Sequence, residues 1–209
     1  KMGVHECMEN TGQSCNSPTR MLVPVHRKDE AYSIAKETAE NIVAGAPNDN
    51  ETNIGPVVSE IQFERVQKLI QTGINEGAKL LTGGSGKPDG LKIGFYVKPT
   101  VFGDVDNDMT IAREEIFGPV LSIIPYENIN NAVSIANDTD YGLAAYVSGN
   151  DNKQLNVIAR RLRAGQIHLN YGSGGTKAPF GGYKQSGNGR EKDKWGLEEF
   201  LEVKAIIGT

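Results

Sequence analysis

The chain has 209 residues, of which 38% are hydrophobic and 23% are charged. This length suits one substantial domain, and the composition is that of a globular protein and not of a disordered or collagen-like chain. The 22 basic and 26 acidic side chains give a net charge of −4, and no run of lysine or arginine could follow a phosphate backbone, so no nucleic-acid partner is expected. No membrane association is expected either, because no stretch approaches the roughly 20 apolar residues that cross a bilayer.

In chain order, the first half of the sequence alternates strand and helix signals. An apolar run at 21–25 predicts a strand, and apolar residues at helical spacing over 29–43 predict a helix. Ser59 has the position of an N-cap for a second helix, which Gly77 ends. Two short strands are then predicted, at 78–81 and 95–102.

The second half continues the alternation. Its predicted elements are a strand at 120–126, a helix at 129–136, strands at 141–148 and 166–170 around a helix that ends at Gly165, a short helix after 194 and a strand at 202–207. Strand and helix units of this length imply right-handed crossovers, so the sequence predicts an α/β fold with a largely parallel sheet flanked by helices.

Residues 171–190 differ from the rest because they are rich in glycine and poor in aliphatic side chains. Such a stretch cannot build a core. It forms either a flexible surface loop or a shaped wall around a ligand.

The two cysteines, Cys7 and Cys15, are too few for a disulfide scaffold and indicate a reducing compartment, so a cytoplasmic location is expected. Cys15 stands in a polar, turn-rich segment, where backbone N–H groups can stabilise a nucleophilic thiolate. The alternative is a buried structural cysteine, which is the reading expected for Cys7. No metal site is expected, because His5, His26 and His168 lack partners at ligand spacing.

Glu114 and Glu115 stand just before Phe117 and a Gly-Pro turn that leads into a predicted strand. A carboxylate there can accept hydrogen bonds from both hydroxyls of a ribose, and the aromatic ring can pack on a planar group. The alternative is a solvated charge pair beside a core phenylalanine.

Three motifs occur in order along the chain: GQSC at 12–15, EEIFGPV at 114–120, and PFGGYKQSG at 179–187 followed by GRE at 189–191. Together they resemble the aldehyde dehydrogenase superfamily, specifically its C-terminal catalytic portion. The likeness extends to NIGPV at 53–57 and covers nearly the whole chain.

The resemblance implies a role for each matching residue. Cys15 would be the nucleophile and its backbone N–H an oxyanion donor. Glu115 would hold the nicotinamide ribose of NAD or NADP, and Phe117 would steady the nicotinamide ring. Phe180 would line the substrate channel, and Tyr171 begins a segment at the substrate entrance where the sequence departs from better-known relatives.

The resemblance also implies a division of the protein. Residues 1–201 would be the catalytic domain and 202–209 a C-terminal strand for oligomerisation. The N-terminal cofactor domain, the general-base glutamate and the asparagine oxyanion donor are absent from the chain. The expected partners are therefore a small-molecule aldehyde and either a second copy of the chain or a complementing cofactor-domain half.

Two other functions remain open from the sequence. The chain can be a non-catalytic assembly or binding module of the same family, which joins a partner sheet through 202–207 by strand addition. It can also be a thiol esterase that uses Cys15 without a cofactor.

Overall fold

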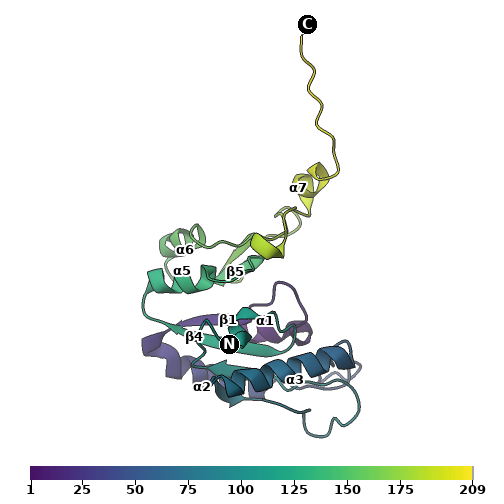
Figure 1. Ribbon diagram of the computed structural model, residues 1–209, viewed down its shortest axis with the longest axis vertical. Helices are drawn as coiled ribbons and strands as arrows, with labels where there is room; N and C mark the ends of the chain where they lie inside the picture. The colour runs from purple at the N-terminus through teal and green to yellow at the C-terminus, as the bar shows by residue number, and fades with distance from the viewer. Residues whose placement is uncertain (209) are drawn as a thin grey trace. The chain divides into compact units, whose positions relative to one another are not determined.

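The computed structural model describes residues 1–208 of the chain. They divide into two compact units, Lys1–Asp138 and the part that begins at Thr139. Each unit is built around its own sheet (Figure 1). The boundary between them falls inside the predicted domain of residues 1–201.

The first unit contains a four-stranded sheet in the order β1-β4-β3-β2. Strand β4 is central, pairing in parallel with both β1 and β3, whereas β2 pairs antiparallel with β3. The strands are β1 (Arg20–Pro24), β2 (Lys79–Thr82), β3 (Thr100–Gly103) and β4 (Val120–Tyr126).

The sheet is therefore mixed, and the prediction of a largely parallel sheet needs correction at β2. Parallel neighbours need a crossover connection, usually a helix, to return the chain to the same end of the sheet. Residues 83–99 between β2 and β3 contain no helix. The chain therefore turns back, and β2 becomes an antiparallel edge strand.

Helices cover both faces of this sheet, because β4 alternates its side chains between two cores. Val120 and Ile124 belong to a core that includes one face of α3, while Leu121 and Ile123 belong to a core shared with α1 and α2. Side chains of a strand alternate between the faces of its sheet, so β4 is buried on both. The helices of this unit are α1 (Met2–Met8), α2 (Lys28–Glu40), α3 (Glu60–Asn75), α4 (Thr110–Arg113) and α5 (Ile129–Asn137), with 3₁₀ turns η1 (Glu9–Gly12) and η2 (Val25–Arg27).

The start and end signals of α3 are confirmed. The Ser59 hydroxyl accepts a hydrogen bond from the Gln62 backbone N–H at 3.2 Å, which caps the helix. Gly77 follows the last turn with φ +93°, a backbone conformation that favours glycine.

The second unit contains two parallel strands connected by a helix. Strand β5 (Ala144–Val147) pairs with β6 (Gln166–Leu169), and α6 (Asn152–Ala159) connects them. The 3₁₀ turn η3 (Lys184–Ser186) and helix α7 (Asp193–Glu198) follow. A Cβ added at Gly165 would lie 1.7 Å from the Gly181 carbonyl oxygen, so the glycine-rich segment packs backbone to backbone against the start of β6.

The predicted strand at 202–207 has no partner strand among residues 1–208, so a role of this segment in oligomerisation stays a prediction. Residues 202–208 have no regular secondary structure and are exposed. A strand needs a neighbouring strand to satisfy its backbone groups, and no strand of the described chain pairs with this segment. The predicted strand at 95–102 is also shortened to β3, which begins just after Pro99, a residue without a backbone donor.

Among residues 1–208, no helix combines the length and apolar character needed to cross a bilayer.

Candidate active site

Cys15 lies in an exposed turn after η1, and its thiol is free. The Ser17 backbone N–H donates to the Ser14 carbonyl at 3.0 Å, which closes the turn around Cys15. The Ser17 hydroxyl donates to the Cys7 carbonyl at 3.0 Å and ties the turn to α1. The buried alternative for Cys15 is therefore wrong in this chain.

The backbone just before this turn is in a rare conformation. Asn10, Thr11 and Gly12 have φ values of 49°, 60° and 69°. For a β-branched residue such as Thr11 this conformation is strained, and it persists only where the surroundings hold it. Thr11 is buried, and its hydroxyl donates to the Gly55 carbonyl at 3.1 Å.

Gly12 brings the cysteine loop against the segment that carries Glu115 and Phe117. A Cβ at Gly12 would lie 2.1 Å from the Gly118 carbonyl oxygen and 2.8 Å from the Pro119 nitrogen. Only a residue without a side chain permits this approach. The GQSC and EEIFGPV motifs, about 100 residues apart in sequence, therefore touch through their glycines.

Two side chains of helix α3 donate hydrogen bonds to backbone carbonyls of the segment around Phe117. Gln62 Nε2 donates to the carbonyls of Ile116 and Phe117 at 3.0 and 2.8 Å. Arg65 donates to the carbonyls of Glu115 and Ile116 at 2.5 and 2.9 Å. Phe117 has φ +55°, so these bonds hold a residue that is not glycine in a left-handed conformation.

The two glutamates of this segment have different surroundings. Glu114 forms an ion pair with Arg65 at 3.7 Å. Glu115 is also exposed, and nothing within residues 1–208 pairs with its carboxylate. Phe117 is half-buried and does not belong to either hydrophobic core. The Glu115 carboxylate is therefore available to a ligand.

Cys7 is a packing residue, as predicted. It is completely buried between α1 and β4, where its thiol lies 3.6 Å from the Val120 carbonyl oxygen. Burial raises the pKa of Cys7 to about 12, because the thiolate would lose its hydration. In the described part of the chain, no three histidine, cysteine or acidic side chains gather as metal ligands.

Phe180 and Tyr171 lie in the second unit. Phe180 exchanges backbone hydrogen bonds with Glu191 at 3.0 and 2.7 Å, and the Lys192 ammonium lies 5.4 Å from the centre of its ring. This backbone pairing fixes the glycine-rich segment to residue 191 at the position of Phe180.

Tyr171 belongs to an aromatic cluster at the end of β6. The Tyr146 ring stacks on His168 at 4.7 Å and lies 5.7 Å from Tyr171. His168 Nδ1 is within hydrogen-bond distance of the Gly172 carbonyl oxygen, at 2.8 Å. Tyr171 itself has a left-handed backbone conformation, with φ +60°.

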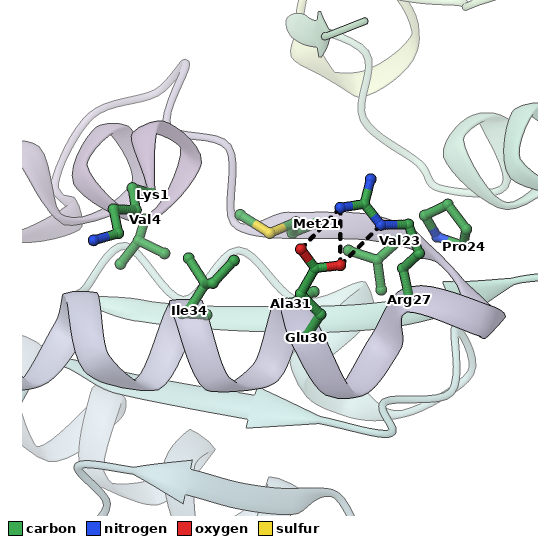
Figure 2. Close-up of a pocket in the computed structure, with 10 residues that line it drawn as sticks. Lys1, Val4, Met21, Val23, Pro24, Arg27, Glu30, Ala31 and Ile34 are labelled. Carbon is green, nitrogen blue, oxygen red and sulfur yellow. Dashed lines mark hydrogen bonds and ion pairs between the residues drawn. The ribbon is translucent and has the colours of Figure 1, made fainter.

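A separate groove of about 210 Å³ runs beside the edge strand β1 (Figure 2). Val4 of α1, Met21 and Val23 of β1 and Ile34 of α2 give it an apolar floor. Arg27 and Glu30, which also line it, form an ion pair at 2.8 Å. Its lining contains none of the predicted site residues, so it is distinct from the cysteine loop.

The sequence does not indicate the residues that hold the segment around Phe117 in place. Gln62 and Arg65 lie one helical turn apart on α3, on the side of the helix that meets the segment around Phe117. Their spacing places both on one face of a helix, but nothing in the sequence indicates which distant carbonyls that face meets.

The chain is similar to known proteins along nearly its whole length. The model of the aldehyde dehydrogenase family matches residues 1–206. A 3-succinoylsemialdehyde-pyridine dehydrogenase from a Pseudomonas species is 53% identical over 208 residues, which are 100% of this chain and 44% of that protein.

Solved structures are equally similar. Aldehyde dehydrogenase C from Pseudomonas syringae, in complex with NAD⁺ and octanal, has a TM-score of 0.96 and 55% identity over 98% of this chain and 42% of its own. An aldehyde dehydrogenase from Mycobacterium tuberculosis in complex with NAD⁺ has a TM-score of 0.93 and 46% identity over 95% of this chain and 41% of its own. The chain thus spans less than half the length of these relatives.

Because Cys15 is exposed and Cys7 is buried, we predict that an alkylating reagent modifies Cys15 selectively. At pH 8, a thiol whose pKa is about 12 is ionised in only about one molecule in ten thousand, and Cys7 is also inaccessible. We expect iodoacetamide to modify Cys15 at least 100-fold faster than Cys7, measured by mass spectrometry of fragments. The difference should vanish in guanidinium chloride, and equal rates in the folded protein would contradict the burial of Cys7.

The contact at Gly12 predicts a large effect of one methyl group. Gly12→Ala adds a clash with Gly118 to the cost of a positive φ, whereas Gly77→Ala meets nothing within 4 Å. We expect Gly77→Ala to lower the free energy of unfolding by about 1 kcal/mol and Gly12→Ala by at least twice that, measured by urea denaturation. Equal losses would mean that the two loops do not touch.

Proposed function

The chain belongs to the aldehyde dehydrogenase family, and from this premise we propose that it supplies the nucleophile-bearing catalytic portion of an enzyme that oxidises an aldehyde to a carboxylic acid with NAD or NADP. The observation that carries the proposal is the contact of Gly12 with Gly118. This contact sets the loop of an exposed thiol against a segment with an unpaired carboxylate and a half-buried aromatic ring.

The residues of this segment fit a nicotinamide nucleotide. The Glu115 carboxylate has oxygen atoms to accept hydrogen bonds from both hydroxyls of a ribose, and Phe117 offers an apolar face to a planar ring. The NAD⁺ in the solved relatives supports this assignment. When bound, the cofactor supplies the hydride acceptor that the oxidation of an aldehyde requires.

Cys15 performs the covalent steps. Its thiolate attacks the aldehyde carbon, and the carbonyl oxygen takes up the negative charge, toward which the backbone N–H of Cys15 is a donor. Loss of a hydride from this carbon, to the acceptor that the bound cofactor would supply, re-forms the C=O bond and leaves the product attached to Cys15 as a thioester. Water then attacks the thioester carbonyl, which releases the carboxylic acid and returns the thiol.

The second unit is proposed to contact the substrate. Phe180 lines the substrate channel, and Tyr171 stands at its entrance. Hydrogen bonds to Glu191 hold Phe180, and the Tyr146 and His168 rings support Tyr171. Fixed aromatic side chains suit a wall for an apolar part of an aldehyde.

A second candidate function is assembly, which the exposed C-terminal segment favours. Val203 is 98% exposed and Ile207 is 94% exposed, and neither packs on the described chain. Apolar residues in an extended segment suit addition to the sheet edge of a second copy or of a complementing cofactor-domain half. This role is compatible with catalysis, and a dimer without redox activity would favour assembly alone.

Replacement of the nucleophile tests the catalytic role. We expect Cys15→Ala to abolish formation of reduced NAD or NADP from a short aldehyde by this chain together with the remaining portion of a relative. Cys7→Ala is the matched control and should keep turnover wherever the variant folds. Persistent turnover in Cys15→Ala would overturn the proposal.

The two adjacent glutamates provide a matched pair for the cofactor role. In the same complemented protein, Glu115→Gln should raise the dissociation constant of NAD about tenfold, since hydrogen bonds to a charged group contribute about 1.5–3 kcal/mol. Glu114→Gln should change it less than twofold, because Glu114 pairs with Arg65 at the surface. Titration of the cofactor by fluorescence measures both, and equal effects would contradict the assignment of Glu115.

A further inference from the structure

The Gln13 side chain bridges two segments that are 45 residues apart. Its carbonyl oxygen accepts a hydrogen bond from the Val58 backbone N–H at 2.8 Å, and its Nε2 donates to the Asn10 carbonyl at 3.2 Å. The Asn10 side chain donates in return to the backbone carbonyl of Gln13 at 2.9 Å. One carboxamide therefore joins the strained turn before Cys15 to the residue that precedes the N-cap of α3.

Helix α3 continues this connection to the other half of the site. Val58 is followed by the N-cap Ser59, and one turn later Gln62 donates to the carbonyls of Ile116 and Phe117. A Cβ added at Gly118 would lie 2.7 Å from a methyl carbon of Val66, so α3 also packs closely on that glycine. The cysteine loop and the segment around Phe117 thus share one rigid support.

We propose that Gln13 is a positioning residue, which acts through Val58 and α3 to couple the placement of the Cys15 loop to that of the segment around Phe117. This inference rests on the proposed role of Cys15 as the nucleophile. It adds that the positions of the Cys15 loop and of the segment around Phe117 depend on each other. A displacement of the Ile116 and Phe117 carbonyls therefore also displaces the Cys15 thiol.

The bridge uses both ends of a carboxamide. The side-chain oxygen accepts from the Val58 N–H, and Nε2 adds a second donor to the Asn10 carbonyl, which also accepts from the Gln13 backbone N–H at 3.1 Å. A glutamate of the same shape keeps the acceptor but places a negative charge beside the Asn10 carbonyl. An alanine loses both side-chain bonds and leaves the turn with the bonds between Asn10 and the Gln13 backbone and with its Thr11 and Gly12 contacts.

The test is a double-mutant cycle that reads the alkylation rate of Cys15 in the 209-residue protein. The variants are Gln13→Ala, Gln62→Ala and the double variant, and a synthetic peptide of residues 9–17 gives the rate of an unconstrained Cys15. Gln154→Ala is the matched control, because Gln154 is exposed on α6 in the other unit. Urea denaturation of each variant shows how much folded protein is present.

We expect the rate of the unsubstituted protein to differ at least tenfold from that of the peptide. Each single variant should move the rate at least threefold toward the peptide value, and the double variant should equal Gln13→Ala, because Gln62 acts through the same connection. Gln154→Ala should leave the rate unchanged. If Gln13→Ala does not fold, Gln13→Glu takes its place in the cycle with the same expected coupling.

Three results would overturn the proposal: a rate in the unsubstituted protein within twofold of the peptide, no effect of Gln13 substitution, or effects of the two glutamines that multiply independently. Independent effects are the result expected if Gln13 and Gln62 each act only on their own segment. Because alkylation needs neither cofactor nor turnover, such results leave a Cys15-dependent oxidation intact. Conversely, turnover without Cys15 overturns the proposed function while the coupling remains measurable.

Discussion

The backbone contact between Gly12 and Gly118 is the constraint on which the first unit's site depends. Two loops come within a distance that no side chain allows, so the thiol loop and the segment with Glu115 and Phe117 meet at a fixed point. The contact joins two segments about 100 residues apart in sequence, so its geometry depends on the sheet and helices that bring them together around β4. The site is thus a product of the whole unit.

Strain is concentrated where this contact is made. Thr11 and Phe117 both have left-handed backbone conformations that cost energy in residues other than glycine. Hydrogen bonds to distant residues hold each of them: the Thr11 hydroxyl donates to the Gly55 carbonyl, and Gln62 of α3 donates to the Phe117 carbonyl. Packing of α3 in the core therefore stabilises the segment around Phe117, while the Gly55 carbonyl, outside α3, anchors Thr11, and this preorganisation suits a reactive site.

The sequence predicts the periodic parts of this fold well and the tertiary parts poorly. The apolar run at 120–126 coincides with β4, and Ser59 caps α3, because both depend on local patterns. The antiparallel β2 and the unpaired segment at 202–207 depend on which strands are neighbours, which no local pattern specifies. Likewise, motifs indicate Cys15 and Glu115, but Gln13, Gln62 and Arg65 emerge only from contacts between distant segments.

Nuclear Overhauser effects in the 209-residue protein test most directly whether the two motif loops touch. We expect cross-peaks from the Gly12 Hα protons to the Hδ protons of Pro119, of intensity comparable to those between the paired strands β3 and β4. Strong cross-peaks between β3 and β4 with none from Gly12 to Gly118 or Pro119 would show that the sheet forms without the contact between the loops, contrary to this expectation.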